Sequence, residues 1–148
     1  KPITKNVTEI IESNYIAIEK ENLVVRFDQI KKNILSKSFN VIDARSLERF
    51  EGKVSEPRKG LRSGHIQNSF CLPFSLCINQ KTGEFKNLEE LRELFNQHEN
   101  IEKRLDPVFT CGSGVTAAVL AYAYKMVNND YIPKIYDGSW SEYGKYPA

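Results

Sequence analysis

The segment Cys111-Gly112-Ser113-Gly114-Val115-Thr116 has the residue types and spacing best suited to chemistry. It begins with a nucleophilic thiol, and its two glycines allow the backbone to curl so that successive N–H groups point inward. The apolar run 107–110 precedes it, and an alanine-rich stretch follows to about Val127. Inward N–H groups and the dipole of a following helix favour a thiolate and any anion bound to it. The spacing predicts an activated Cys111 in an anion-binding loop, with the Ser113 and Thr116 hydroxyls on the same ring.

The other two of the three cysteines, Cys71 and Cys77, have no glycine-rich turn beside them. We predict that both are structural, because a free cysteine is commonly a small, inert apolar residue. Three cysteines are too few for a disulfide framework, and they suit a reducing, intracellular compartment, cytoplasmic or mitochondrial. The sequence has no Cys-x-x-Cys pair, and His65 and His98 lie far apart, so we expect no metal site.

Length and composition indicate one folded domain. The 148 residues include 41% apolar and 11% aromatic side chains, enough for a core, and 21 basic against 19 acidic residues. This near balance of charge does not indicate a strongly basic surface of the kind that binds nucleic acid or an acidic membrane. The longest nearly uncharged helical stretch, 115–124, is too short to span a bilayer. We interpret residues 1–12 as a linker or tail and residues 13–148 as the domain.

Short apolar strands alternate with helical patterns along the domain. The expected strands are short apolar runs bounded by turn residues: 15–18 as an edge strand, 40–43, 69–74, 107–110 and 134–136. The expected helices begin near Phe27, after Asn87 with a capping box to Glu90, and after the cysteine loop. Residues 44–64, with four arginines and two lysines, indicate a long functional loop. This order predicts an α/β fold with a central, mainly parallel five-stranded sheet flanked by helices.

Several segments, in order, resemble the rhodanese-like sulfurtransferases. The cysteine loop is similar to the active-site loop of that family. The other matching pieces are Val41-Ile42-Asp43-Ala44-Arg45, Arg49-Phe50, Glu56-Pro57-Arg58, Gly64-His65-Ile66 and Asp137-Gly138-Ser139-Trp140. Together they cover most of residues 13–146, and they are most similar to the C-terminal catalytic domain of 3-mercaptopyruvate sulfurtransferases. The resemblance implies a rhodanese-like fold.

The resemblance also implies the roles of individual residues. Cys111 would take sulfur from 3-mercaptopyruvate as a persulfide and pass it to a thiol or to cyanide, with no metal or organic cofactor. Ser113 would assist as a catalytic hydroxyl, and Arg49 and Arg58 would bind the substrate carboxylate. The loop residues expected to contact substrate are Gly112, Gly114, Val115 and Thr116. Asp43 and Arg45 would brace the loop, His65 would anchor it, and Trp140 would belong to the core.

The choice of sulfur donor depends on the two residues after the cysteine. Thiosulfate-preferring relatives usually carry Arg and Lys there, whereas this chain has Gly112 and Ser113, which favours a keto acid gripped by more distant guanidinium groups. Glu48 stands where the family usually has Gly. The expected partners are a small-molecule donor, a thiol acceptor such as thioredoxin or a small thiol, and an upstream rhodanese-like domain in the full-length chain. We expect no nucleic acid and no membrane.

Three other functions remain open from the sequence. A thiosulfate sulfurtransferase would use the same cysteine. A phosphatase or arsenate reductase on a related scaffold would have a loop one residue longer that closes on arginine, whereas this loop closes on Thr116. A noncatalytic rhodanese-like binding module often lacks the cysteine, which is present here with both arginines.

Overall fold

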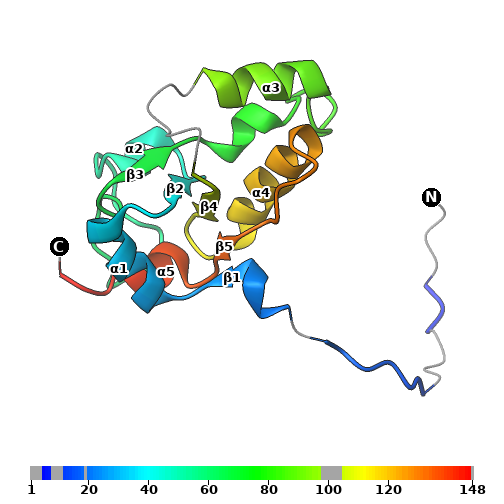
Figure 1. The fold of residues 1–148 in the computed structure, drawn as a ribbon, viewed down its shortest axis with the longest axis horizontal. Helices are drawn as coiled ribbons and strands as arrows, with labels where there is room; N and C mark the ends of the chain where they lie inside the picture. Colours follow the sequence, from blue (N-terminus) through cyan, green and yellow to red (C-terminus); the bar gives the residue numbers. More distant parts are fainter. Residues whose placement is uncertain (1–4, 8–11, 19, 98–104, 148) are drawn as a thin grey trace.

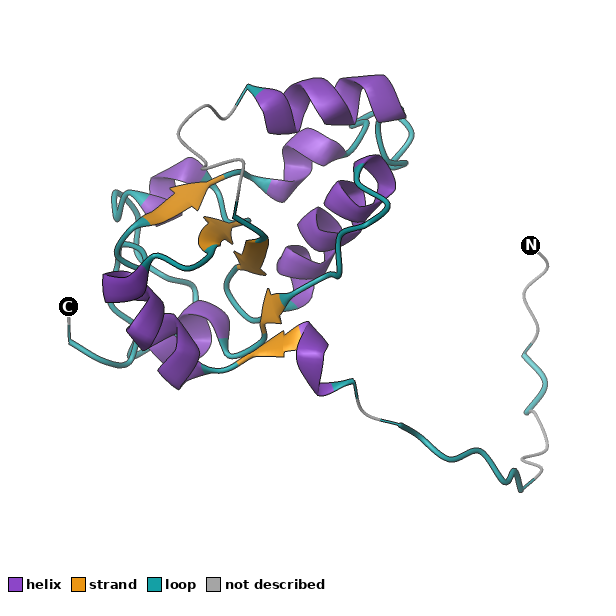
Figure 2. Cartoon of the chain, in the orientation of Figure 1, coloured by secondary structure: helices purple, strands orange, loops and turns teal. Residues whose placement is uncertain are grey.

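The fold is built around one five-stranded sheet (Figures 1 and 2). The computed structural model describes residues 5–7, 12–18, 20–97 and 105–147. The strands are β1 (Val24–Val25), β2 (Asn40–Asp43), β3 (Ser69–Cys71), β4 (Pro107–Thr110) and β5 (Ile135–Tyr136), in the order β1-β5-β4-β2-β3. Every pairing within this sheet is parallel. The predicted α/β fold with a five-stranded parallel sheet is therefore confirmed.

Helices cover both faces of the sheet. They are α1 (Phe27–Ser36), α2 (Leu47–Phe50), α3 (Leu88–Asn96), α4 (Val115–Val127) and α5 (Ser139–Tyr143), with 3-10 turns η1 (Glu21–Leu23) and η2 (Phe74–Cys77). Figure 1 shows α1 and α5 on one side of the sheet and α3, η2 and α4 on the other. This three-layer arrangement explains why the central strands are apolar along their whole length.

The two central strands, β2 and β4, are buried at every position. Successive side chains of a strand point to opposite faces, so neighbouring residues enter different cores. Val41 and Val108 pack in the core that α1 and α5 cover, with Ile30 and Trp140. Ile42 and Phe109 pack in the core on the other face, with residues of η2, α3 and α4. Burial on both faces fixes these strands firmly, and Cys111 follows β4 directly.

The start of α3 confirms the predicted capping box. The Asn87 Oδ1 accepts hydrogen bonds from the N–H groups of Glu89 and Glu90, both at 3.0 Å. The Glu90 carboxylate accepts the N–H of Asn87 in return, at 3.1 Å. The backbone N–H groups of Asn87, Glu89 and Glu90 thus all have hydrogen-bond partners. On the inner face of the helix, Leu91 is fully buried.

Helix α4 positions the cysteine loop. Its buried residues are Ala117, Leu120, Ala121 and Ala123, so it lies against the sheet mainly through small side chains. The short loop of residues 111–114 joins the carboxyl end of β4 to the amino end of this helix. In the part of the chain that the structure describes, no helix is both long enough and apolar enough to cross a membrane.

Three boundaries differ from the sequence predictions. The predicted edge strand at residues 15–18 is wrong: these residues form no strand, and the side chains of Tyr15, Ile16 and Ile18 are more than 80% exposed. The edge strand is β1 instead, because Val24 and Val25 lie in register with β5. The long loop after β2 contains the one-turn helix α2, and the third strand ends at Cys71 rather than at position 74. His98 lies outside the described residues.

Candidate active site

Cys111 lies between the carboxyl end of β4 and the amino end of α4, and it is 2% exposed. The Ser113 N–H donates to its Sγ at 3.4 Å. The Thr116 hydroxyl and the N–H groups of Thr116 and Ala117 also lie near enough to this sulfur to stabilise its thiolate. Burial alone would raise the pKa of the Cys111 thiol, but these donors outweigh it and lower the pKa below its ordinary value. The predicted activation of this cysteine therefore has a structural basis.

The other two thiols have the opposite environment. Burial raises the pKa of Cys71 to about 12 and that of Cys77 to about 11. Cys71 donates its S–H to the carbonyl oxygen of Arg45 at 3.6 Å, and Cys77 is fully buried. At neutral pH both are protonated, which supports the prediction that they are structural.

A pocket of about 410 Å³ opens over the cysteine loop. It is lined by Arg49, Pro57, Arg58, Cys111, Gly112, Ser113, Val115 and Thr116. The structure thus brings seven of the eight predicted site residues together around one cavity. The Ser113 hydroxyl has no hydrogen-bond partner among the described residues, so it is available to a ligand. Gly114 is the predicted residue that does not line the pocket.

The two arginines converge over Gly112. A Cβ atom at Gly112 would lie 3.2 Å from Nη2 of Arg49 and 3.5 Å from Nη1 of Arg58. Both guanidinium groups thus occupy the space that a side chain at this position would need. Glycine at this position leaves room for the two cations to approach the loop backbone.

Glu56 orients Arg49. Its carboxylate accepts two hydrogen bonds from Arg49, from Nε at 3.1 Å and from Nη2 at 2.6 Å. The hydrogen bond to Glu56 is the main cause of the raised pKa of Arg49. This contact uses one edge of the planar guanidinium, and the other edge, Nη1 and Nη2, faces Gly112. Arg49 is therefore held ready to offer two N–H groups to an anion.

A buried ion-pair network supports this orientation. Arg45 binds Asp43 through Nε at 2.9 Å and through Nη2 at 2.7 Å, and it donates from Nη1 to Glu56 at 2.9 Å. The side chains of Arg45, Asp43 and Glu56 are at most 1% exposed. Two carboxylates here balance the guanidinium groups of Arg45 and Arg49. Arg58 forms no ion pair within the described residues, so it supplies the pocket's uncompensated positive charge.

Gly114 shapes the loop without reaching the pocket. Its φ of +83° lies in the left-handed region, and a Cβ atom there would lie 2.7 Å from Oδ1 of Asp137. Its N–H donates to the hydroxyl of Ser139 at 3.1 Å. The structure therefore gives Gly114 a conformational role, and substrate contact by this residue stays a prediction.

The supporting roles expected for other matched residues are confirmed. The Nδ1 of His65 is hydrogen-bonded to the carbonyl oxygen of Phe50 at 2.8 Å, and its ring stacks on that of Phe50, so it anchors the long loop. Trp140 is 1% exposed, and the guanidinium carbons of Arg45 and Arg62 lie over its ring, 4.5 and 4.6 Å from the centroid. Neither residue lines the pocket over Cys111.

Sequence reasoning missed the roles of Glu56, Ala117 and Ser139. An acidic residue in an otherwise basic loop was the available signal for Glu56. The N–H of Ala117 acts on the sulfur only because α4 begins at Val115, and Ser139 lies 28 residues from Cys111. No pattern of neighbouring residues in the sequence predicts these two contacts.

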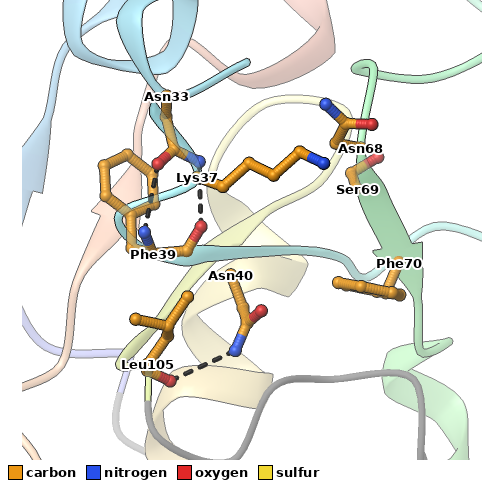
Figure 3. A pocket seen from close by; sticks show the side chains of 8 residues that line it. All are labelled: Asn33, Lys37, Phe39, Asn40, Asn68, Ser69, Phe70 and Leu105. Carbon is orange, nitrogen blue, oxygen red and sulfur yellow. Dashed lines mark hydrogen bonds between the residues drawn. The ribbon is translucent and has the colours of Figure 1, made fainter. Parts of the chain in front are cut away.

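A second pocket, of about 270 Å³, lies at the amino ends of the strands (Figure 3). Its asparagines are engaged with the backbone: Asn33 donates to Phe39 O at 2.8 Å and accepts its N–H at 3.0 Å, and Asn40 donates to Leu105 O at 3.2 Å. Neither cysteine nor arginine is among its lining residues. The reactive groups therefore gather at the carboxyl edge of the sheet, as expected for an open parallel sheet.

Comparisons with known proteins agree with this arrangement. Residues 27–146 match the family model described as a rhodanese-like domain. The chain is 41% identical to the mitochondrial thiosulfate/3-mercaptopyruvate sulfurtransferase 1 of Arabidopsis thaliana, over 85% of this chain and 32% of that protein. It is 34% identical to human 3-mercaptopyruvate sulfurtransferase, over 96% and 47% respectively.

The crystal structure of SseA from Escherichia coli, a 3-mercaptopyruvate sulfotransferase with the rhodanese fold, superposes with a TM-score of 0.75. The identity is 30%, over 94% of this chain and 50% of that one. The chain therefore spans about a third to a half of the length of these relatives.

Proposed function

The chain belongs to the rhodanese-like domain family, and we propose that it is a sulfurtransferase that moves a sulfane sulfur from 3-mercaptopyruvate to a thiol or to cyanide. One observation carries this proposal: a cysteine with a lowered pKa lies in a pocket over which two guanidinium groups converge. A thiolate attacks electrophilic sulfur, and the cations bind the carboxylate of a small acid.

In the first step, the Cys111 thiolate attacks the sulfur of the donor. A bond forms between Sγ and that sulfur, and the bond between sulfur and carbon breaks. The electron pair of the broken bond leaves with pyruvate as its enolate, which takes up a proton. The Ser113 hydroxyl, which lines the pocket, is placed to relay that proton or to hydrogen-bond the substrate. Cys111 is left as a persulfide.

In the second step, an acceptor thiolate or cyanide attacks the outer sulfur of the persulfide. The sulfur–sulfur bond breaks, its electron pair returns to Sγ, and the Cys111 thiolate is restored. The donors that lower the thiol pKa stabilise the leaving thiolate here. All bonds made and broken involve the substrates and one cysteine, so we propose covalent catalysis without a metal or an organic cofactor.

Arg49 and Arg58 are proposed to bind the donor carboxylate. The free Nη edge of Arg49 offers a planar pair of donors, and Arg58 adds a net positive charge. Glu56 prevents Arg49 from turning away, so little side-chain entropy is lost when the substrate binds. These features suit a keto acid whose carboxylate is displaced from its reacting sulfur.

Thiosulfate is the second candidate donor. One relative is named for both thiosulfate and 3-mercaptopyruvate. The loop itself offers no cationic side chain at Gly112 or Ser113, which favours mercaptopyruvate, but Arg49 and Arg58 lie close enough to attract a dianion. A noncatalytic binding module would not need the lowered pKa of Cys111. A loop closing on Thr116 rather than arginine disfavours phosphatase or arsenate reductase activity.

We further propose that the acceptor is thioredoxin or a small thiol and that an upstream rhodanese-like domain completes the full-length protein. The greater length of the relatives supports the second point. Val115, at the rim of the pocket, is 72% exposed and offers a contact surface beside the site. An intracellular compartment, cytoplasmic or mitochondrial, is consistent with three free thiols and with the name of one relative.

Steady-state assays of both donors test the proposal. We expect the chain to release pyruvate from 3-mercaptopyruvate with a higher kcat/KM than it shows for thiosulfate, with cyanide as acceptor. Cys111→Ser should abolish transfer from both donors, while Cys71→Ser should retain it. A higher kcat/KM for thiosulfate would reverse the order of the two candidates, and full activity of Cys111→Ser would overturn the function itself.

A further inference from the structure

Ser139 occupies an unusual position beside the cysteine loop. It follows β5 and begins α5, and its side chain is fully buried. Its φ of +50° lies in the left-handed region, which a residue with a Cβ atom rarely adopts. Strain of this kind persists only where the surrounding contacts hold it in place. The contacts of the Ser139 hydroxyl identify what holds it.

The Ser139 hydroxyl joins both ends of the cysteine loop. Its Oγ accepts the N–H of Cys111 and the N–H of Gly114, each at 3.1 Å. It donates to the carbonyl oxygen of Tyr136 at 2.8 Å. The Thr110 hydroxyl also donates to it, at 3.3 Å, so the buried oxygen has four partners and its hydrogen-bonding capacity is filled. The same atom thus connects the nucleophile's own backbone to the glycine at which the loop turns.

The next two residues hold the outside of the loop. The N–H of Trp140 donates to the carbonyl oxygen of Cys111, and the N–H of Ser141 donates to that of Gly112, both at 2.9 Å. With these carbonyls turned toward α5, the N–H groups of Ser113, Thr116 and Ala117 point at the Cys111 sulfur. The hydroxyl of Ser139 and the two N–H groups therefore fix the loop from its outer side.

We propose that Ser139 is a positioning residue, whose hydroxyl holds the loop in the conformation that presents N–H donors to the Cys111 sulfur. The inference deepens the proposed sulfurtransferase function and rests on it for its biological meaning. Ser139 touches neither the pocket nor the sulfur. It acts through the loop backbone, and its loss should make the thiolate less stable rather than remove a reacting group.

Charged groups near the loop must stay unchanged for the test to report on the hydroxyl. They are Arg49 and Arg58 over Gly112, Asp137 beside Gly114, and the buried Asp43–Arg45–Glu56 network. None of them is hydrogen-bonded to the Ser139 side chain. A change at Ser139 therefore removes loop contacts without removing a charge.

The experiment measures the alkylation of Cys111 by iodoacetamide as a function of pH, with peptide mapping by mass spectrometry. In Ser139→Ala and Ser139→Gly, we expect the midpoint of the Cys111 alkylation profile to rise by about one pH unit, because the thiolate is less well stabilised. Glycine tolerates φ of +50°, so Ser139→Gly removes the hydroxyl without backbone strain. Iodoacetamide needs no sulfur donor, so this test is separate from that of the enzymatic function.

Ser69→Ala is the matched control. The Ser69 hydroxyl donates to the carbonyl oxygen of Ile66, three residues earlier, at 2.6 Å, as that of Ser139 does to Tyr136. Ser69 is the first residue of β3 and lines the pocket at the amino ends of the strands (Figure 3), whereas Cys111 follows the carboxyl end of β4. We expect no shift of the Cys111 midpoint in this variant. An unchanged midpoint in folded Ser139→Ala or Ser139→Gly, or an equal shift in Ser69→Ala, would overturn the proposal.

Amide hydrogen exchange in the unaltered protein gives an answer even if both Ser139 variants fail to fold. The N–H groups of Cys111 and Gly114 donate to a buried hydroxyl, so we expect both to exchange slowly. The N–H of Gly112 has no partner among the described residues and should exchange faster. If the amides of Cys111 and Gly114 exchange as fast as that of Gly112, Ser139 does not hold the loop.

Discussion

At the residue scale, the three cysteines differ in the direction of their pKa shifts: the pKa is lowered for Cys111 and raised for Cys71 and Cys77. All three are at least partly buried, so burial alone does not distinguish them. The difference is the set of hydrogen-bond donors around the Cys111 sulfur, which come from the loop and from the first turn of α4. A glycine-rich strand-to-helix turn is visible in sequence, so Cys111 can be chosen as the candidate reactive cysteine without a structure.

The order of alkylation with pH follows from this contrast. The pKa of Cys111 is lowered, while those of Cys77 and Cys71 are raised to about 11 and about 12. At pH 7 to 8, Cys111 therefore carries the largest thiolate fraction, and the other two gain theirs only as pH rises toward those values. Peptide mapping after brief iodoacetamide treatment should show Cys111 labelled first. Earlier labelling of Cys71 or Cys77 in the folded protein would contradict the assignment.

The arginines can be tested one at a time. Arg49→Ala and Arg58→Ala should each lower kcat/KM for 3-mercaptopyruvate roughly 30-fold. Each variant loses a charge-assisted contact, which corresponds to about 2 kcal/mol of transition-state stabilisation. Arg49→Lys should not restore the rate, since an ammonium cannot bind Glu56 and a carboxylate through two edges. Arg92→Ala, on the exposed face of α3, is the control. Unchanged kcat/KM in both pocket variants would remove these arginines from the mechanism.

At the element scale, the loop between β4 and α4 combines sequence features with contacts that only the fold supplies. Strands β2 and β4 and helices α3 and α4 are predictable because apolar runs and a capping box are local signals. The edge strand is not, because Val24 and Val25 form too short a run and become a strand only through pairing with β5. Ser139 is missed for the same reason, since its partners lie far away in the sequence.

Gly114→Ala tests the conformation of the loop. The φ of +83° and the Asp137 carboxylate at 2.7 Å should together cost at least about 2 kcal/mol in the free energy of unfolding. Gly60→Ala is a matched control, because Gly60 has a φ of +80° and no atom within 4 Å of a Cβ there. This control should lose only about 1 kcal/mol, the cost of the backbone conformation alone. Urea denaturation measures both; equal losses would show that the contact with Asp137 does not matter.

The donor preference depends on the loop residues that follow the cysteine. Ser113→Lys places a cation at a half-buried position that lines the pocket. We expect the ratio of kcat/KM for thiosulfate to kcat/KM for 3-mercaptopyruvate to rise roughly fivefold, which corresponds to about 1 kcal/mol. Gly112→Arg would change two things at once: it would add a cation, and its Cβ atom, 3.2 Å from Nη2 of Arg49, would displace that side chain. Ser113→Ala controls for loss of the hydroxyl. A ratio that stays the same in Ser113→Lys would place specificity elsewhere, with Glu48 as the next candidate.

At the scale of the whole molecule, the parallel sheet collects the site at one edge. The long loop after β2 supplies Arg49 and Arg58, the end of β4 supplies Cys111, and the turn after β5 supplies Ser139. The ends of three strands therefore bring residues distant in sequence to one edge of the sheet, and cores on both faces hold the strands in place. Residues 12–18 lie away from this body in Figure 1, with no helix or strand.

The central claim is that Cys111 of this chain accepts a sulfur atom, and intact-mass measurement tests it most directly. After incubation with 3-mercaptopyruvate and removal of the donor, we expect the protein to gain the mass of one sulfur atom. Peptide mapping should place it on Cys111, and a reducing thiol should remove it. Cys111→Ser should gain nothing, while Cys71→Ser should behave as the unaltered chain does. A gain located on Cys71 or Cys77, or no gain on Cys111 from either 3-mercaptopyruvate or thiosulfate, would contradict the account.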